Sequence, residues 1–333
     1  MAPARAGIQR RNPALTGRRC AAYMARPMAT HDIQRLNGQF GVPGHLEFRS
    51  IQGGLPAAVI RNRHASATVA LHGGHVTAFQ PHGQDPVLWM SRCSRFQTGA
   101  PIRGGIPICW PWFGAHPTRA QAPFHGFARV SEWDVARAQA LDDGSTLIEL
   151  GLADTPQSRE LWPHPFGLRL RVRVSTELDV ELTMLNTGHE PMTCSAALHS
   201  YFAVSEVASI RVRGLEGTPF MDTVQSVPVP GVEDQPLVIR SETDRIYLDT
   251  ESRCSIDDPG LRRCIRIAKR GSRSTVVWNP WIAKSARMPD FGDDEFHRML
   301  CIETANAAAD AREIASGETH VLDTVISVEP LST

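Results

Sequence analysis

Two neighbouring segments of the chain alternate between apolar and polar residues with a period of two. In LRLRVRV (168–174) and LDVELTM (178–184), every even position is apolar and every odd position is polar or charged. This period is typical of a β-strand with one buried face and one wetter face. The three residues between the segments are enough for a short loop, so the pattern predicts an antiparallel hairpin.

The charges of this hairpin predict its register. If the loop is centred on Thr176, Arg173 lies opposite Asp179 and Arg171 lies opposite Glu181. Opposite charges across two strands stabilise their pairing, whereas a shift by one residue would move every apolar side chain to the wet face. We therefore expect this register.

The rest of the chain favours an all-β fold of many short antiparallel strands. HVLDTVISV (320–328) alternates in the same way, and shorter strand-like runs are VALHG, STLIEL, SIRVRG and RCIRIA. The 26 glycines and 24 prolines recur throughout, and helical periodicity is scarce. This pattern predicts a large β-sandwich with few short helices, and residues 31–333 show no reason for division into separate domains. The exception is ANAAADAREIA (305–315), whose composition suits a helix.

Composition and charge exclude several classes of protein. The chain has 35 basic and 35 acidic residues, so it lacks the charge excess of proteins that bind nucleic acids or anionic membranes. No apolar run approaches the roughly 18 residues of a membrane span. The seven cysteines occur singly, without the spacing of a zinc site or a disulfide framework, which favours a reducing compartment. We expect a soluble, cytoplasmic protein.

The first thirty residues differ from the rest of the chain. They contain six arginines and no acidic residue, and they lack the apolar core of a secretory signal. We interpret residues 1–30 as a disordered basic extension, because chain termini are often unstructured. A transit peptide, or a later start at Met24 or Met28, is the alternative.

Two loops contain the densest unusual chemistry. PIRGGIPICWPWFG (101–114) combines Arg103 with paired glycines, three prolines and two tryptophans, and PFHGFAR (123–129) adds His125 and Arg129. The first composition predicts a rigid loop whose tryptophans offer flat faces to a sugar, with a well-packed structural turn as the alternative. Two arginines on neighbouring loops could bind a phosphate or carboxylate, although either one alone is more often a surface residue.

Two ionisable residues interrupt apolar runs. His199 lies within LHSYF (198–202), which otherwise has the pattern of a buried strand, and Glu303 ends the run Met-Leu-Cys-Ile in RMLCIETAN (298–306). A lone histidine of this kind is usually a satisfied core residue, and such a glutamate usually marks where a strand reaches solvent. Spacing alone does not pair the two residues.

The order of the motifs resembles a known family. Over residues 35–330, the chain resembles the hexose-6-phosphate mutarotases, or glucose-6-phosphate 1-epimerases, of the aldose 1-epimerase superfamily. The motifs that carry the resemblance are GGHVTAF, PVLWMS, PIRGGIPICWPWFG, HGFAR, LHSYF, ETDRIY, VVWNPW, DFGDDEF and CIETAN. Two features depart from the family pattern: Phe124 precedes HGFAR where glutamine or serine is common, and the arginine-rich beginning has no counterpart.

The resemblance implies a β-supersandwich of the galactose mutarotase type with an open sugar cleft. It also favours an extended loop over a helix at 305–315. By similarity, the site residues are the catalytic pair His199 and Glu303, the sugar ligand Asp244, the phosphate ligands Arg103 and Arg129, and His125 beside them in the cleft.

The implied reaction is the interconversion of the α and β anomers of a hexose 6-phosphate, with glucose 6-phosphate as the expected substrate. Ring opening needs a base at the anomeric hydroxyl and an acid at the ring oxygen, and a carboxylate and an imidazolium suit these roles. No redox change or group transfer occurs, so we expect no metal and no cofactor. We expect a monomer whose partner is a small sugar phosphate, with no nucleic acid and no membrane partner.

Two alternatives stay open, of which the second comes from another class of protein. The first is an aldose 1-epimerase for unphosphorylated sugars, against which Arg103 and Arg129 speak. The second is a non-catalytic carbohydrate-binding or regulatory protein, which should have lost His199 or Glu303; the chain has both.

Overall fold

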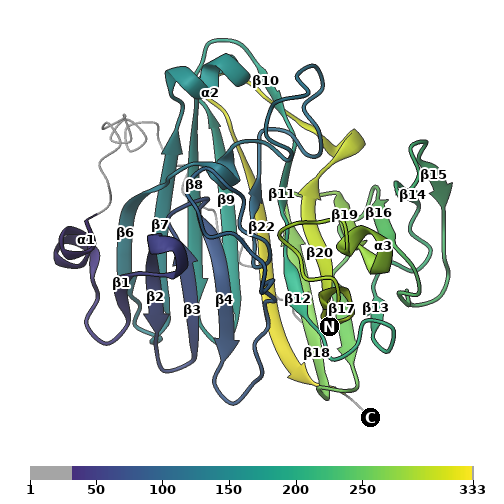
Figure 1. Cartoon of the computed structure of the whole chain (residues 1–333). Coiled ribbons are helices and arrows are strands. Elements are labelled where there is room, and N and C mark those ends of the chain that lie inside the picture. The colour runs from purple at the N-terminus through teal and green to yellow at the C-terminus, as the bar shows by residue number, and fades with distance from the viewer. Residues whose placement is uncertain (1–31, 332–333) are drawn as a thin grey trace, which may run out of the picture.

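The computed structural model describes residues 32–331, which consist mostly of antiparallel strands (Figure 1). The predictions about residues 1–30 lie outside this range. None of the helices within 32–331 has both the length and the apolar character that a membrane crossing requires.

The elements of the first half of the described chain are α1 (Ile33–Phe40), β1 (Leu46–Ser50), β2 (Pro56–Arg61), β3 (Ala65–Ala70), β4 (His75–Pro81), β5 (Ile108–Cys109), β6 (Asp134–Ala140), β7 (Thr146–Ala153), α2 (Pro156–Leu161), β8 (Phe166–Val174) and β9 (Leu178–Asn186). Those of the second half are β10 (Met192–Cys194), β11 (Ala196–Leu198), β12 (Tyr201–Ala203), β13 (Arg211–Arg213), β14 (Phe220–Asp222), β15 (Val229–Gly231), β16 (Thr243–Tyr247), β17 (Cys254–Asp258), β18 (Arg263–Arg270), β19 (Ser274–Asn279), α3 (Trp281–Ser285), β20 (Met299–Asn306), β21 (Arg312–Ile314) and β22 (Thr319–Pro330). Short 3-10 turns lie at Gln52–Gly54, Ala128–Val130, Glu295–Arg298 and Ala308–Asp310.

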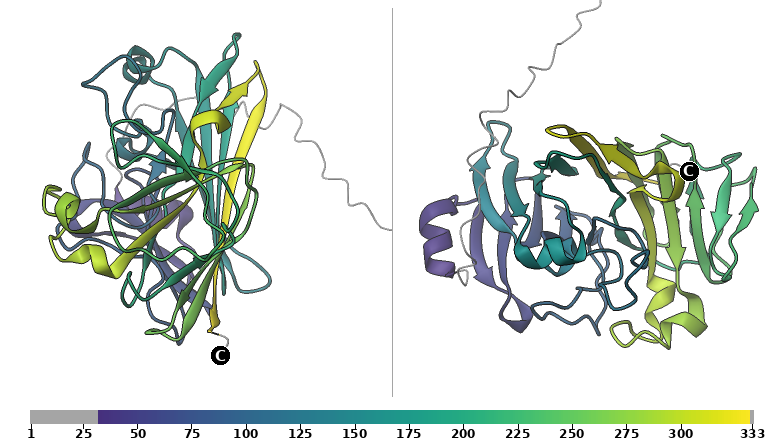
Figure 2. Two further views of the ribbon diagram at one scale, coloured as in Figure 1. Left: turned by 90° about the vertical axis from the view of Figure 1, so that its right-hand side faces the viewer. Right: turned by 90° about the horizontal axis from the view of Figure 1, so that it is seen from above.

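The strands form two packed layers (Figures 1 and 2). One layer is an eight-stranded sheet in the order β13-β17-β18-β22-β9-β8-β7-β6. The other contains the four-stranded sheet β1-β2-β3-β4 and a second eight-stranded sheet, β15-β14-β16-β19-β20-β11-β5, with β12 paired to β20. The layers meet where β3 packs on β8 and where β11 and β20 pack on β22. An apolar cluster with members from Leu36 to Ile326 joins both layers, which confirms the predicted all-β sandwich.

The hairpin β8–β9 confirms the register predicted from its charges. Arg173 pairs with Asp179 and Arg171 with Glu181 across the two strands, and buried residues alternate with half-buried ones along both. The Arg171 and Glu181 side chains lie 3.7 Å apart. The Arg173 guanidinium instead forms its ion pair with Asp143, which lies in the turn between β6 and β7. The backbone register was therefore predictable, but one of the two ion pairs was not.

The segment 305–315 is extended, as the resemblance implies, and its helix-like composition is overridden. It contains the end of β20, one short 3-10 turn and the strand β21. The Asn306 amide nitrogen donates to the Gly271 carbonyl (2.9 Å) and the Asp310 carboxylate (2.8 Å), and the His320 ring lies 3.0 Å from the Asn306 amide oxygen. These long-range bonds fix the chain in a path that intrinsic helix propensity, a weak preference, cannot oppose.

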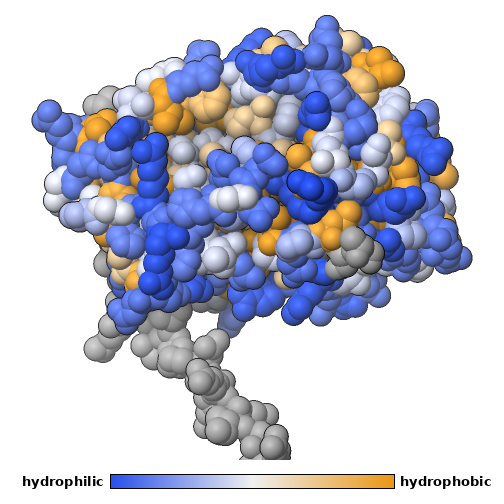
Figure 3. Space-filling model, turned by 90° about the horizontal axis from the view of Figure 1, so that it is seen from below, coloured by the Kyte–Doolittle hydropathy of each residue, from blue (hydrophilic) through white to orange (hydrophobic). Residues whose placement is uncertain are grey.

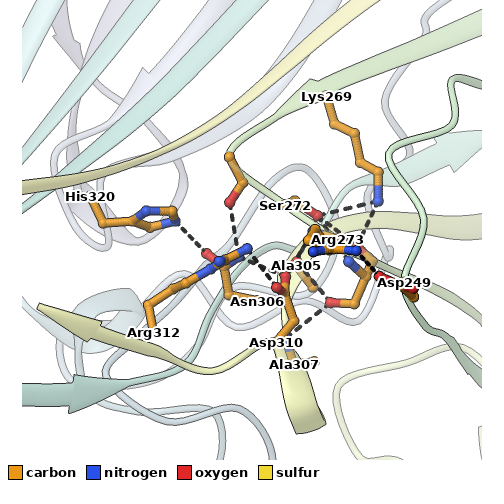
Figure 4. Close-up of polar contacts among 12 residues, drawn as sticks. Asp249, Lys269, Ser272, Arg273, Ala305, Asn306, Ala307, Asp310, Arg312 and His320 are labelled. Atoms are coloured by element: carbon orange, nitrogen blue, oxygen red, sulfur yellow. Dashed lines mark hydrogen bonds and ion pairs between the residues drawn. The ribbon is translucent and has the colours of Figure 1, made fainter.

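A polar network holds the end of β20 against the turn between β18 and β19 (Figure 4). The Lys269 ammonium donates to the Ser272 hydroxyl (3.2 Å) and the Ser274 carbonyl (2.9 Å). The Ser272 hydroxyl is 2.7 Å from the Ala305 carbonyl oxygen. Because Ala305 lies two residues after Glu303, this network helps to fix the strand that carries the predicted catalytic carboxylate.

Apolar residues on the surface lie in small patches between polar ones on the face that Figure 3 shows. The strand β15, at the edge of its sheet, carries or adjoins three of the exposed large apolar side chains within the described range: Val227, Val229 and Val232. Pro230, in the middle of β15, has no N–H to donate. A proline in an edge strand limits further strand pairing, so it protects this edge.

Candidate active site

The sheet places His199 directly opposite Glu303. The short strands β11 and β12 both pair with β20, Leu198 with Thr304 and Tyr201 with Cys301. The register is the same on both sides of the interruption, so His199 faces Glu303 across the strands. The run 198–202 is thus two strands and not the single strand that its apolar pattern suggests. The ladder is interrupted because the His199 N–H donates sideways to the Pro107 carbonyl (3.1 Å).

The two side chains meet in a nearly closed environment. The His199 Nδ1 atom lies 3.3 Å from the Glu303 Oε1 atom, and the two residues are only 5% and 1% exposed. Neither Nδ1 of His199 nor Oε2 of Glu303 has a hydrogen-bond partner within the described part of the chain, so the contact is close but poorly aligned. Buried polar atoms without partners cost free energy and are rare in folded proteins. Such atoms are suited to a ligand that supplies hydroxyl groups.

Burial moves both groups toward their neutral forms. Burial raises the pKa of Glu303 well above its usual range; the Asp244 charge raises it further, while Arg129 opposes this. Burial also lowers the pKa of His199, and the charges of Arg129 and Arg103 lower it further. A neutral carboxylic acid and a neutral imidazole together carry as many protons as a carboxylate and an imidazolium. One proton shift between adjacent groups therefore interconverts the two states.

Aromatic side chains fix the orientation of the imidazole. The His199 ring stacks on Tyr201 with a centroid distance of 4.7 Å and an interplanar angle of 6°, and the Trp278 ring meets it edge-on at 6.2 Å. The Tyr201 hydroxyl accepts a hydrogen bond from Arg103 (3.0 Å). Tyr201 thus links the histidine to one of the two predicted phosphate-binding arginines. The sequence signal for Tyr201 is its spacing, because it follows His199 by two residues in LHSYF.

Arg103 is already engaged by a carboxylate. Its guanidinium makes hydrogen bonds to both carboxylate oxygens of Asp290, with a closest ion-pair distance of 3.1 Å. A phosphate at Arg103 would have to share this guanidinium with Asp290. The only sequence signal for Asp290 is its place in the motif DFGDDEF.

His125 and Arg129 approach the pair from the loop after β5. The His125 ring centroid is 5.6 Å from that of His199, and His125 Nδ1 accepts a hydrogen bond from the Gly114 N–H (3.0 Å). Its backbone has a φ of 61°, a left-handed conformation that is uncommon for histidine and often occurs at functional sites. The buried Arg129 donates from one terminal nitrogen to the Phe124 carbonyl (2.6 Å), but its Nε has no partner among residues 32–331. Both side chains therefore have donor capacity left for an anion.

Asp244 lies on β16, which is paired with β19 beside the aromatic residue Trp278. Its carboxylate is half-buried and 3.6 Å from the Lys284 ammonium. Burial raises the pKa of Asp244, and the Lys284 charge opposes this shift. Because the Asp244 charge in turn raises the pKa of Glu303, the two carboxyl groups lie in one electrostatic environment.

The expectation that the tryptophans of 101–114 face a sugar is wrong. Trp110 and Trp112 are buried and belong to the main apolar cluster, where Trp110 packs edge-on against Phe127 and Phe166. The structural-turn alternative is correct for these two side chains, because their large apolar surfaces gain more from the sandwich core than from a wet cleft. The aromatic side chains beside His199 are Tyr201 and Trp278 instead.

A surface hollow of about 730 Å³ lies between the loop at Arg92 and the segment 286–294, and Phe291 is part of its lining. None of the six predicted site residues lines this hollow. Its lining residue Phe291 directly follows Asp290 in the chain, and Asp290 is the ion-pair partner of Arg103.

Comparison with known proteins identifies the family. The sequence model of the family described as "Aldose 1-epimerase" matches residues 56–327. The chain belongs to the aldose 1-epimerase family. A relative from Salmonella typhimurium, named "Putative glucose-6-phosphate 1-epimerase", is 36% identical over 256 residues, which cover 77% of this chain and 84% of the relative. One from Cenchrus ciliaris with the same name is 34% identical and covers 76% of this chain and 78% of its own length.

A solved structure shows the same architecture as this aldose 1-epimerase family member. The crystal structure of a "putative mutarotase" from Salmonella typhimurium superposes with a TM-score of 0.81 at 32% identity, and the match covers 90% of this chain and 100% of the other. The match to mutarotase structures confirms the galactose mutarotase type of fold that the resemblance implies.

Proposed function

We propose that this protein interconverts the α and β anomers of a hexose 6-phosphate and that glucose 6-phosphate is its substrate. The observation that carries the proposal is the buried contact between His199 and Glu303, an acid and a base 3.3 Å apart with polar atoms that have no hydrogen-bond partner among residues 32–331. The names of the relatives from Salmonella typhimurium and Cenchrus ciliaris support the choice of substrate.

The reaction requires two proton transfers around the anomeric carbon. In ring opening, the Glu303 carboxylate takes the proton of the anomeric hydroxyl while the His199 imidazolium gives a proton to the ring oxygen. The C1–C2 bond then rotates, and ring closure on the other face uses the same groups with their roles exchanged. The neutral pair of the free site reaches the reactive state when one proton moves from Glu303 to His199. Each such group typically contributes about a hundred- to ten-thousand-fold in rate.

Arg103, Arg129 and His125 would hold the phosphate. Arg129 offers an Nε that has no partner in the described part of the chain. His125 offers Nε2–H when it is neutral, and burial and the Arg129 charge favour the neutral form because they lower its pKa. Arg103 would contribute while it keeps part of its contact with Asp290. We propose that Asp244 binds sugar hydroxyl groups. We also keep as predictions that the protein is cytoplasmic, monomeric and independent of a cofactor.

A coupled assay tests the proposed function. Freshly dissolved α-glucose 6-phosphate is presented to a dehydrogenase that oxidises only the β anomer, and the initial lag is recorded with and without the protein. We expect the wild type to remove the lag and His199→Asn to leave it. A lag that persists with folded wild-type protein would contradict the proposal.

The same preparations separate the two alternatives. An epimerase for unphosphorylated sugars would accelerate the mutarotation of free α-glucose, followed by optical rotation, at least as well as that of the phosphorylated sugar. A non-catalytic binding protein would bind glucose 6-phosphate in calorimetry without an effect on either reaction.

A further inference from the structure

A thiol lies beside the dyad on the same strand. Cys301 precedes Glu303 by two residues, and successive side chains of a strand point to opposite faces, so both are on one side of β20. Ligand atoms of His199, Cys301 and Glu303 all lie within 4.8 Å of one another, and all three residues are buried. The proposed mechanism gives Cys301 no task.

The positions of these atoms fit a tetrahedral metal site. Zinc binds histidine nitrogen and carboxylate oxygen at about 2.0–2.2 Å and cysteine sulfur at about 2.3 Å, so neighbouring ligands of a tetrahedral ion are about 3.3–3.8 Å apart. The 3.3 Å between His199 Nδ1 and Glu303 Oε1 already has this value. The ligand atoms of the three residues lie within 4.8 Å of one another, so the Cys301 sulfur must move about 1 Å closer to the other two ligand atoms. A rotation of its side chain can supply this movement.

We propose that His199, Cys301 and Glu303 form a binding site for a thiophilic divalent cation such as Zn²⁺, and that the bound cation blocks the dyad. Two ligand atoms in this site lack a protein partner, because neither His199 Nδ1 nor Glu303 Oε2 has a hydrogen bond within the described chain. A set of one nitrogen, one sulfur and one oxygen favours Zn²⁺ over Mg²⁺, which prefers oxygen ligands alone. With three protein ligands, the fourth position is open to water.

The surrounding charges act in both directions: Arg129 and Arg103 disfavour a positive charge at His199, whereas Asp244 favours one near Glu303. Asp244 influences Glu303 more strongly than Arg129 does, and the Arg103 charge is compensated by Asp290. Burial, followed by the Glu303 charge, raises the pKa of the Cys301 thiol, so the cation has to displace a proton when it binds. This displacement lowers the affinity without removing the site.

Inhibition in the coupled assay is the first test, and this arm depends on the proposed function. We expect Zn²⁺ to inhibit the wild type, a chelator to restore activity, Mg²⁺ to have no effect and glucose 6-phosphate to protect. The Cys301→Ser variant should lose at least about tenfold in sensitivity to Zn²⁺, with each rate compared with that of the same variant without Zn²⁺. The matched control is Cys93→Ser, because Cys93 is an exposed thiol outside the site and its loss should change nothing. Equal inhibition of wild type and Cys301→Ser would overturn the proposal.

Direct binding is the second test and is independent of any catalysis. Co²⁺ added to the metal-free wild type should give the near-ultraviolet charge-transfer band of a thiolate-bound cobalt, and Zn²⁺ should displace it. The band should disappear in Cys301→Ser and Cys301→Ala and remain in Cys93→Ser, with folding of each variant checked by circular dichroism. A wild type without the band refutes the metal site even if the protein is an active epimerase. A wild type with the band but no epimerase activity refutes only the proposed function.

Discussion

The strands β9 and β20 lie in different sheets of the same sandwich and differ in how deeply they bury their ionisable residues. Along β9, buried residues alternate with half-buried ones, and the acidic side chains occupy the wetter positions. Along β20, all eight residues are buried, Glu303 included. A strand with one wet face can carry charge at little cost, whereas a strand buried on both faces can carry an ionisable group only by shifting its pKa. Burial is therefore the physical difference between the two strands: it shifts the pKa of Glu303 on β20, and the catalytic role that we propose for Glu303 depends on that shift.

An intermediate case lies within β9 itself. Asp179 is half-buried beside Asp323 of β22, while the Asp323 carboxylate accepts hydrogen bonds from Nε and one terminal nitrogen of Arg270. Burial and the Asp323 charge raise the pKa of Asp179 to about 6. Partial burial thus raises the pKa of Asp179 in the same direction as full burial raises that of Glu303.

The largest expected effect comes from removing the carboxyl group of β20. Glu303→Gln keeps the shape of the side chain but cannot accept a proton, so we expect kcat to fall by at least about a hundredfold. Thermal stability should stay the same or rise, because no ionisable group then remains buried at this position. Glu181→Gln on β9 is the matched control and should leave kcat unchanged. Activity of Glu303→Gln within about threefold of wild type would remove this residue from the mechanism.

The next largest effect is expected for Arg103, which lies near the dyad, in contrast to Arg173 on the wetter face of the hairpin β8–β9. Arg103→Ala should raise KM for glucose 6-phosphate about ten- to a hundredfold, because a hydrogen bond to a charged group contributes about 1.5–3 kcal/mol. Activity on free glucose should barely change, and Arg173→Ala on β8 should affect neither substrate. Because Asp290 competes with a phosphate for Arg103, Asp290→Asn should leave KM unchanged or lower it. Equal losses on both sugars in Arg103→Ala would show that this arginine only supports its loop.

A smaller effect on stability is expected at Asp179. Its pKa is higher in the folded chain, about 6, than its ordinary value of 3.8, so the folded state holds this proton more tightly. The stabilisation is complete below about pH 4 and is lost as the pH rises through about 6. Asp179→Asn should therefore raise the free energy of unfolding by about 1 kcal/mol at pH 8, after allowance for partial exposure, and by little at pH 4. Denaturant unfolding at both pH values measures this; the same difference at both would contradict the assignment.

The smallest effect is expected for the ion pair on the wet face of the hairpin. Arg171 and Glu181 are 3.7 Å apart and partly exposed. A double-mutant cycle with alanine at both positions should give a coupling energy below about 0.5 kcal/mol, which decreases further in high salt. A coupling energy above about 1.5 kcal/mol would mean that water screens this ion pair less than its partial exposure indicates.

The hairpin β8–β9 shows how far local patterns reach. Its period of two, its three-residue loop and its opposite charges lie within one short stretch, so the sequence alone determined both strands and their register. The same kind of evidence did not reveal that Arg173 would turn to Asp143, because that carboxylate belongs to another turn of the chain. Five of the six site residues stand out by their unusual sequence context, but their roles, and Asp244 itself, came from the resemblance to a family.

What the sequence determined by itself is the all-β class, the hairpin and the set of motifs, because periodicity and turn residues act between near neighbours in the chain. What only the tertiary structure decided is which distant residues meet. The order β19-β20-β11 places Glu303 opposite His199, and burial by both layers then shifts their pKa values. The tertiary structure also pairs Arg103 with Asp290 and buries Trp110 in the core. These outcomes depend on strand order and on the exclusion of water, which arise only when the two layers pack together.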